Sequence, residues 1–429
     1  MMTPRPSPTL SSSPSPHHTL DHRTLYRLPW SAADNVIAWL EPTAKCNLSC
    51  EGCYRENVAE HKSLAQVQAD LDLFRRQRVF DGVSIAGGDP LMHPEIVEIV
   101  RLVATQGWKP ILNTNGLAMT RELLVELKRA GLVGLTFHVD SKQGRPGWRG
   151  KTEIETNELR QQYADLVADV GGVSCAFNST VYQDTLDSVP DLVAWAQRNI
   201  DKVHVMVFIA YREAIVGEFD YYQGTKKVDV SAIQYVADER RQRTDITSPE
   251  MVAKVRERFP DFAPAAYLGG TEKADSFKWL LCGRVGTKEQ ILGYPGGRMM
   301  EAVQTINHLV NGRYLAYAPP GMLGMGRSAL ALGATIDPGA RKGLGNYLRW
   351  IAGRPTRALE QLHYQSIMFI QPIDILPDGR QNMCDACPDI TVHDGELVWS
   401  CRLEEQRGYG CFLRTVPKTG AQLKPLPCG

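Results

Sequence analysis

The feature that most constrains the fold is an alternation of short β-branched runs with longer amphipathic runs, from Asn35 to about Tyr211. Glycine, proline or asparagine separates the runs, which is the pattern of repeated β-α units around a parallel sheet. We expect strands at 35–43, 82–88, 109–115, 133–140, 173–181 and 202–210, and helices starting near Ser63, Pro94, Thr120, Glu153 and Asp187. Six such units predict an α/β fold, a partial (β/α)6 barrel, with ligands at the carboxyl ends of its strands.

The regular alternation stops beyond Arg212, and the rest of the chain predicts a different organisation. Residues 230–243 and 249–259 have helix-like patterns, and the glycine-dense stretch 268–338 predicts a loop-rich region. We therefore divide the chain into a disordered tail, a barrel core, a loop-rich and helical extension and a C-terminal cysteine-rich module, at 1–30, 31–215, 216–370 and 371–429.

Charge and hydropathy exclude several classes of protein. Lysine plus arginine and aspartate plus glutamate both number 48, so no global field draws the chain to nucleic acid or to an anionic membrane. Any such partner has to be recognised locally. We find no run of about 18 uncharged apolar residues and therefore expect no spanning helix. The first twenty residues lack the apolar core of a secretory signal, which predicts a cytoplasmic protein whose ten cysteines serve as metal ligands more readily than as disulfides.

Three cysteines lie within eight residues, directly after the first predicted strand: Cys46, Cys50 and Cys53. A loop of this size can bring three sulfurs to one iron–sulfur cluster and leave one iron without a protein ligand. A structural zinc site normally has four ligands, and a ferredoxin-like run would supply a fourth cysteine. The spacing alone favours the three-ligand cluster over these two alternatives.

The CxxxCxxC spacing after the first strand resembles the signature of the radical S-adenosylmethionine (SAM) superfamily. The resemblance implies a four-iron four-sulfur (4Fe-4S) cluster whose open iron is chelated by SAM, and a one-electron donor such as flavodoxin or ferredoxin. One electron would cleave SAM to methionine and a 5′-deoxyadenosyl radical, which abstracts hydrogen from the substrate. The residue before the third cysteine is often aromatic in the family and packs near the adenine. Here it is Gly52, with Tyr54 as the nearest aromatic candidate.

The second predicted strand ends in Gly87, Gly88, Asp89 and Pro90. Two glycines at a strand end let the backbone approach a ligand closely, although this motif alone would be read as an ordinary β-α turn. It resembles the GGEP motif of radical SAM proteins, whose backbone binds the amino group of SAM. The resemblance therefore implies that these residues contact the cofactor.

Asn113 and Asn115 end the third strand, and Asn178 lies within the fifth. Short polar residues at strand ends can simply cap the following helix. The resemblance implies polar contacts from such positions to the ribose and carboxylate of SAM. Asn178 is the stronger candidate, because an amide inside an otherwise apolar strand needs a partner.

His138 and Asp140 share a face of the fourth strand, since side chains alternate with period two. They could line the substrate side of the barrel and act catalytically, and a hydrogen-bonded core histidine is an equal alternative. Cys175 differs in parity from Asn178, so we expect it to point away from the interior as a structural thiol.

A second group of cysteines lies near the C-terminus, where Cys384 and Cys387 form a CxxC pair and Cys401 follows. Zinc or an iron–sulfur cluster could satisfy it. Many radical SAM enzymes carry a C-terminal SPASM or Twitch module with auxiliary 4Fe-4S clusters and a ligand upstream of the CxxC pair. The resemblance thus implies one auxiliary cluster on these three cysteines and Cys282, with Cys411 as the substitute for Cys282.

These observations together predict a radical SAM enzyme, an oxidoreductase or transferase, that acts on a small-molecule, natural-product or lipid-like substrate. The apolar stretch from Tyr314 to Arg354 could be a core segment or the mouth of a site for a lipid. There is no basic stripe with interleaved aromatic residues, so nucleic acid is not an expected substrate. The alternatives are a peptide-modifying SPASM-type enzyme and a non-catalytic zinc or iron–sulfur protein.

Overall fold

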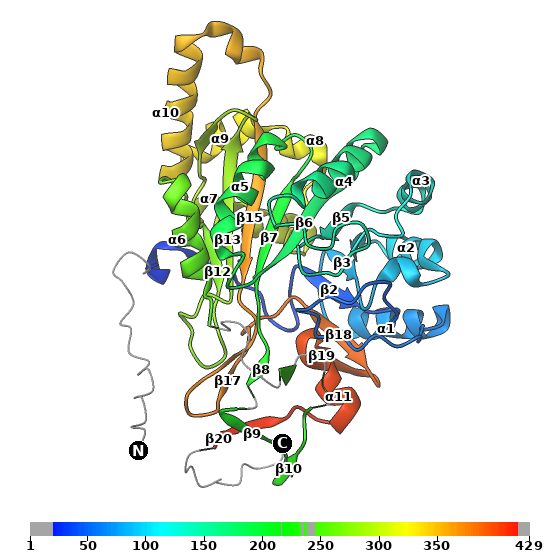
Figure 1. The fold of residues 1–429 in the computed structure, drawn as a ribbon. Helices are drawn as coiled ribbons and strands as arrows, with labels where there is room; N and C mark the ends of the chain where they lie inside the picture. Colours follow the sequence, from blue (N-terminus) through cyan, green and yellow to red (C-terminus); the bar gives the residue numbers. More distant parts are fainter. Residues whose placement is uncertain (1–19, 216, 232, 234–235, 238–244, 419–429) are drawn as a thin grey trace, which may run out of the picture.

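The computed structural model describes residues 20–215, 217–231, 233, 236–237 and 245–418. Its centre is a large sheet whose strands run in the order β1-β12-β13-β15-β7-β6-β5-β4-β3-β2 (Figure 1). The six predicted strands are confirmed as parallel neighbours in chain order: β2 (Ile37–Leu40), β3 (Gly82–Ile85), β4 (Lys109–Thr114), β5 (Gly134–His138), β6 (Ser174–Val181) and β7 (Val205–Ala210). This is the expected α/β partial barrel.

Five helices connect these strands: α1 (Leu64–Gln77), α2 (Ile96–Thr105), α3 (Arg121–Arg129), α4 (Asn157–Val170) and α5 (Val189–Arg198). Local chemistry sets where they start. The Ser63 side chain and Gln66 form a reciprocal capping box at α1, and the Thr120 hydroxyl accepts the Leu123 N–H at α3. The helix α6 (Ser248–Arg258) confirms the helical pattern predicted at 249–259, whereas the one at 230–243 lies mostly outside the described residues.

The main core lies between these helices and the outer face of the sheet. Alternate strand residues such as Leu135, Phe137, Cys175 and Phe177 pack there against apolar residues of α1 to α6. The intervening strand residues point to the inner face, because side chains on a strand alternate. Cys175 is fully buried in the core, as expected of a structural thiol.

Three strands from the predicted extension join the same sheet. β15 (His363–Ile370) pairs in parallel with β7, β13 (Trp279–Gly286) runs antiparallel to β15, and β12 (Ala266–Leu268) runs antiparallel to β13. β14 (Ile291–Gly293) also pairs with β13. The boundaries predicted at 215 and 370 stay predictions. The extension is joined to the barrel core by backbone hydrogen bonds between β15 and β7.

Two expectations about disorder and loops are wrong. Residues 20–30, predicted as the end of the tail, include β1 (Tyr26–Arg27), which pairs with β12, and Leu28 next to it is fully buried. The glycine-dense stretch 268–338 is not mainly loop. Besides β13 and β14 it contains helices that continue to residue 353: α7 (Gly297–Asn311), α8 (Pro320–Leu323), α9 (Gly326–Gly333) and α10 (Pro338–Gly353). Residues 1–19 of the predicted tail lie outside the described residues.

The C-terminal part lies at the opposite end of the sheet from α10 (Figure 1). It contains α11 (Leu403–Tyr409) and small pairs of strands: β16 (Asp374–Ile375) with β17 (Gln381–Asn382), β18 (Ile390–His393) with β19 (Glu396–Trp399), and β20 (Arg414–Pro417) with β9 (Phe219–Gln223), which also pairs with β10 (Lys226–Val228). β8 (Ala214–Ile215) pairs with β11 (Val236–Ala237). No helix among the described residues is long and apolar enough to cross a membrane.

Candidate functional site

The inner face of the sheet borders a cavity of about 2320 Å³. Inward-facing residues from β3 to β7 line it, among them Ser84, Asn113, Thr136 and Asn178. The cavity is larger than the roughly 300–1,000 Å³ typical of small-ligand sites. It therefore has room for a cofactor and a substrate together.

Cys46, Cys50 and Cys53 all line this cavity, on the loop that follows β2. The Leu48 N–H donates to the Cys46 sulfur (3.4 Å), and the Arg55 N–H donates to the Cys53 sulfur (3.4 Å). All three are free thiols. Burial raises the pKa of each, so a bound metal would have to displace the proton to gain a thiolate ligand.

The turn predicted to bind SAM holds the cysteine loop by its backbone. The Gly88 N–H donates to the Thr43 carbonyl (2.9 Å), and the Asp89 N–H donates to the Lys45 carbonyl (2.8 Å). Gly87 has a φ of +107°, which favours glycine. A cofactor amino group donates hydrogen bonds, so at this turn it would bind backbone carbonyl oxygens, while these two N–H groups hold the loop.

We expect Gly88→Ala to disturb the cysteine loop. A Cβ on residue 88 would lie 2.6 Å from the Ala44 carbonyl oxygen. That oxygen belongs to the backbone and cannot rotate away, so the loop has to move. Overpacking of this kind costs about 1–3 kcal/mol. Iron bound per chain after anaerobic reconstitution should fall. Gly345→Ala is the matched control, since nothing lies within 4 Å of its added Cβ; equal iron in both variants would contradict the expectation.

Asp89 is buried and its carboxylate is fully used within the protein. It accepts hydrogen bonds from the Leu91 N–H (2.9 Å), the Thr114 hydroxyl (2.9 Å) and the Asn115 N–H (2.8 Å). Pro90 begins the short 3-10 turn that follows. Asp89 thus fixes the end of β4 beside the cysteine loop and acts as a positioning residue.

The three predicted asparagines differ in what their side chains do. The Asn115 amide donates to Asn47 (2.7 Å) and lies 3.7 Å from the Cys46 sulfur, so it also holds the loop. The Asn113 amide donates to the Ser84 hydroxyl (3.0 Å) on the inner face. Asn178 lines the cavity and makes no side-chain hydrogen bond to any described residue, which leaves its amide available to a ligand.

His138 and Asp140 lie together at the carboxyl end of β5. The His138 Nε2 atom is 3.0 Å from the Asp140 carboxylate and 3.1 Å from the Thr180 hydroxyl. His138 lines the cavity, whereas Asp140 is buried and accepts the Lys142 N–H (2.9 Å). Asp140 also contributes to the raised pKa of Cys50, second to burial, which places this pair beside the first cysteine group.

Two tyrosines that the sequence analysis missed explain the glycine at position 52. A Cβ on Gly52 would lie 2.7 Å from the Tyr182 hydroxyl and 3.3 Å from the Tyr211 ring. These two rings pack against each other, with centroids 4.9 Å apart, and both line the cavity. They occupy the space that a side chain at residue 52 would need, while Tyr54 also lines the cavity. No signal in the local sequence links residues so far apart.

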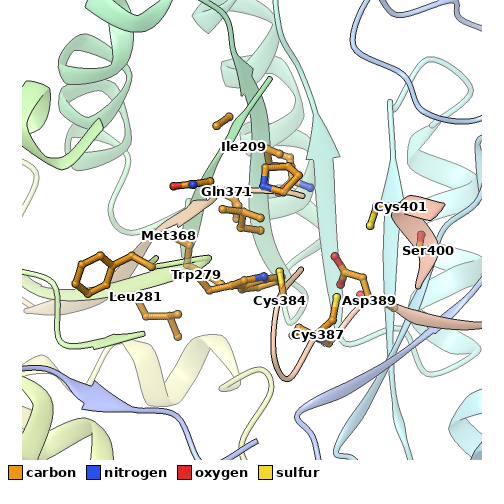
Figure 2. Close-up of a pocket in the computed structure, with 18 of the residues that line it drawn as sticks. Ile209, Trp279, Leu281, Met368, Gln371, Cys384, Cys387, Asp389, Ser400 and Cys401 are labelled. Carbon is orange, nitrogen blue, oxygen red and sulfur yellow. The ribbon is translucent and has the colours of Figure 1, made fainter. Parts of the chain in front are cut away.

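The second cysteine group also lines the cavity. Figure 2 shows Cys384, Cys387 and Asp389 side by side, with Cys401 across from them. The Cys387 thiol interacts most strongly with Cys384, which together with burial raises its pKa. Asp389 is a potential oxygen ligand that the sequence analysis did not consider.

The prediction that Cys282 completes this group is not supported by its surroundings, although Cys282 is also among the residues that line the cavity. Trp279 and Leu281 of β13 face the cavity beside Cys384, so the alternation of the strand points Cys282 to the opposite, helix-facing side. Cys282 is buried there in the main core together with Leu280.

Cys411 does not replace Cys282 in the group. Burial raises the pKa of its thiol, and the charged neighbours that act on it within the described chain are Glu405 and Arg402, with no cysteine among them. Cys428, the last cysteine, lies outside the described residues.

A buried ion pair joins the two cysteine groups. Arg55, two residues after Cys53, donates to Glu41 at the end of β2 (Nε to Oε2, 2.9 Å). The same guanidinium donates to the backbone carbonyl of Ser400 (2.7 Å) and to its hydroxyl (2.8 Å), directly before Cys401. Both charged side chains are almost fully buried. We call Arg55, Glu41 and Ser400 the interloop clamp.

The arrangement of donors fits a cluster better than a single ion. Among the described residues, no three His, Cys, Asp or Glu side chains converge closely enough to ligate one metal ion. A zinc ion needs four ligands about 2.0–2.3 Å from one centre, whereas in a 4Fe-4S cluster each thiolate binds a separate iron. Three partly buried thiols that line one cavity, two of them receiving N–H hydrogen bonds, suit the second type of group.

Comparison with known proteins agrees with this reading of the site. Residues 40–143 match the model of the Radical SAM superfamily. The chain carries a radical SAM domain. The matched range contains the three cysteines of the β2 loop, the Gly87–Pro90 turn and both strand-end asparagines Asn113 and Asn115. The superfamily is one of enzymes, so the domain is an enzyme domain.

Relatives of the radical SAM domain include enzymes with different functions. The chain is 28% identical over 175 residues to an AdoMet-dependent heme synthase of Oleidesulfovibrio alaskensis, covering 38% of this chain and 42% of the relative. It is 29% identical over 184 residues to a GTP 3′,8-cyclase of Geobacter sulfurreducens, covering 41% and 55%. The chain thus spans about half the length of these relatives.

Among solved structures, Streptococcus suis SuiB has 15% sequence identity and a TM-score of 0.38, over 54% of this chain and 46% of that one. A likeness of that size adds nothing to the assignment. The radical SAM domain therefore rests on the sequence match and on the geometry of the cavity.

Proposed function

We propose that the chain is a radical SAM enzyme that reductively cleaves SAM and abstracts hydrogen from a small-molecule, natural-product or lipid-like substrate in the cytoplasm. The observation that carries the proposal is that Cys46, Cys50 and Cys53 face one large cavity together with the turn that follows β3. When bound, the cluster supplies the single electron that converts SAM to methionine and a 5′-deoxyadenosyl radical.

The residues of the chain divide the remaining work. The three thiolates hold the cluster, and the Gly87–Pro90 turn and Asn115 keep their loop in place. Asn178 offers a free amide to SAM or substrate from the inner face of β6. Tyr182, Tyr211 and Tyr54 supply aromatic surface near the loop, on which an adenine could pack.

His138 and Asp140 are proposed to act on the substrate side. Their hydrogen bond fixes the imidazole next to the cavity, where it could hold or move a proton.

We further propose that Cys384, Cys387 and Cys401 bind an auxiliary 4Fe-4S cluster, with Asp389 at the fourth position. The support is that the three line the cavity together, and that Cys282 and Cys411 have other surroundings. Zinc remains the alternative metal for this group. Flavodoxin or ferredoxin is the proposed electron donor.

The decisive experiment is anaerobic reconstitution followed by iron and sulfide analysis and an assay for 5′-deoxyadenosine with SAM and dithionite. We expect about four iron and four sulfide for the first cluster and a similar amount for the second. Formation of 5′-deoxyadenosine supports the enzyme. Zinc in both groups with intact SAM would instead indicate a non-catalytic metal protein.

A peptide-modifying, SPASM-type activity is the second candidate. The size of the cavity is compatible with a peptide segment, and both cysteine groups line it. Activity that requires a peptide substrate, and is absent with apolar small molecules, would favour this candidate.

A further inference from the structure

Helix α7 leaves several of its apolar residues exposed, among them Val303, Ile306 and Leu309. Of its residues, all of which the structure describes, Gln304 alone is buried, and its amide bonds to Leu315 through both the backbone carbonyl (3.2 Å) and the N–H (3.0 Å). Met299, Val303 and Ile306 recur at helical spacing on another face, and Ile306 is 60% exposed. An ordinary surface helix has the reverse arrangement, so the outer face of α7 is suited to an apolar partner.

Apolar side chains that follow α7 in sequence converge with it at one mouth of the cavity. We define the apolar rim as the residues that are both exposed and part of the cavity lining in this region: Val303, Ile306, Met322, Met325, Leu332 and Ile336. Of the fourteen large apolar side chains exposed in the described part of the chain, ten lie between residues 303 and 359. Such clustering marks an interaction surface.

The apolar rim lies at the amino ends of the strands, opposite the cysteine loop. The Ala316 N–H donates to Asp81 (3.0 Å), directly before β3, so the segment after α7 crosses this end of the sheet. Ser174 and Thr180 of β6 both line the cavity and are six residues apart, which corresponds to roughly 20 Å. The cavity is therefore long and suits an elongated molecule that enters at the rim and reaches the cysteines.

Cations outnumber carboxylates in the segment that carries the apolar rim, although the whole chain is neutral. Residues 297–360 contain eight Arg or Lys and three Asp or Glu. Arg298 and Arg341, with Glu301 as the one carboxylate, line a second, shallow hollow together with Ile306 and Ile336 of the rim. Apolar residues flanked by cations are the combination that binds the interface of anionic bilayers.

We propose that the apolar rim and its cations dock on an anionic lipid bilayer, and that an elongated lipid passes from the bilayer into the cavity. The docking proposal rests only on the apolar rim and the cations beside it. The role of that lipid as substrate rests on the proposed function, whose radical chemistry would act at the far end of the cavity.

Flotation of the reconstituted protein with vesicles tests the docking. We expect binding to vesicles of equal parts phosphatidylcholine and phosphatidylglycerol, weaker binding to phosphatidylcholine alone, and a decrease as salt screens the cations. Ile306→Glu should weaken partitioning onto the vesicles about tenfold or more, since it puts a charge where the docked isoleucine would be buried in the bilayer. Ile154→Glu is the matched control, because Ile154 is 48% exposed and lies outside the rim.

Equal binding of both variants, or no binding to the anionic vesicles, would overturn the docking. A dimer that Ile306→Glu converts to a monomer, without vesicle binding, would assign the rim to a second copy of the chain. None of these outcomes depends on 5′-deoxyadenosine formation, so a failure of the docking and a failure of the proposed function are told apart.

The passage of lipid is tested with cis-parinaric acid, whose fluorescence rises in an apolar site. Ala302 lines both the cavity and the hollow beside it, so Ala302→Trp should narrow the mouth. We expect the wild-type protein to bind the probe and the variant to bind it at least about tenfold more weakly, with flotation unchanged. Binding that Ala302→Trp leaves unaltered, or no binding by the wild type, would contradict this route.

Discussion

Replacing Cys50 with alanine should abolish reductive cleavage of SAM. The thiol lines the cavity, on the loop that also carries the other two cysteines, and with one of three ligands lost the cluster has no complete binding site. Removal of a residue that hydrogen-bonds to a metal ligand already lowers metal affinity or activity about 10–100-fold. Loss of a ligand itself should have a larger effect. The measurement is 5′-deoxyadenosine formed from SAM and dithionite, together with iron bound per chain.

Two further variants define what the loss means. Cys175→Ala also removes a buried thiol, but on the outer face of β6 away from the cavity, and should keep the cleavage. Cys387→Ala should leave some cleavage of SAM that is uncoupled from the substrate, because Cys387 is not one of the three ligands of the first cluster. Equal loss in Cys50→Ala and Cys387→Ala would show that the second group is needed for folding.

The barrel could be predicted from the sequence because its signal is local. Each strand between Asn35 and Tyr211 has the period of two that separates a helix-facing side from a cavity-facing side. The same rule placed Cys175 in the core and Asn178 on the inner face. It would also have placed Cys282 in the core, had the run 279–286 been interpreted as a strand rather than as part of a loop-rich region.

The parts that could not be predicted depend on contacts between distant residues. β15 lies beside β7 although some 150 residues separate them, and nothing in either run indicates the pairing. Tyr182 fills the space beside Gly52 in the same way. The inverted polarity of α7 could not be found from composition, because Gln304 is buried only through its bonds to Leu315.

The interloop clamp also depends on a contact between distant residues. Arg55 and Ser400 are far apart in sequence yet lie within hydrogen-bond distance. The Glu41 carboxylate also accepts hydrogen bonds from the Trp39 indole (3.0 Å) and the Ser400 hydroxyl (2.7 Å). The clamp therefore connects the strand before the first cysteine group with the residue before Cys401. Any change in it is felt at both groups.

Arg55→Met should destabilise the protein strongly and lower metal binding at both cysteine groups. Methionine keeps much of the volume but leaves the Glu41 carboxylate buried without its cation, and breaking such a pair costs about 3–5 kcal/mol. Urea denaturation of the apoprotein measures the loss of stability, and iron per chain after reconstitution measures the loss of metal. The double variant Arg55→Met with Glu41→Leu should recover part of the stability, because the Glu41 carboxylate is no longer left buried without its cation.

Arg23→Met is the control for the clamp, since its ion pair with Asp21 is exposed and such pairs contribute about 1 kcal/mol or less. If Arg55→Met cost no more than Arg23→Met, the clamp would not be what holds the two groups together. If it lowered stability but left iron at both groups unchanged, the clamp would stabilise the fold without positioning the cysteines. The expected result is the combination, a large loss of stability with iron reduced at both groups, because Arg55 follows Cys53 by two residues and its partner Ser400 directly precedes Cys401.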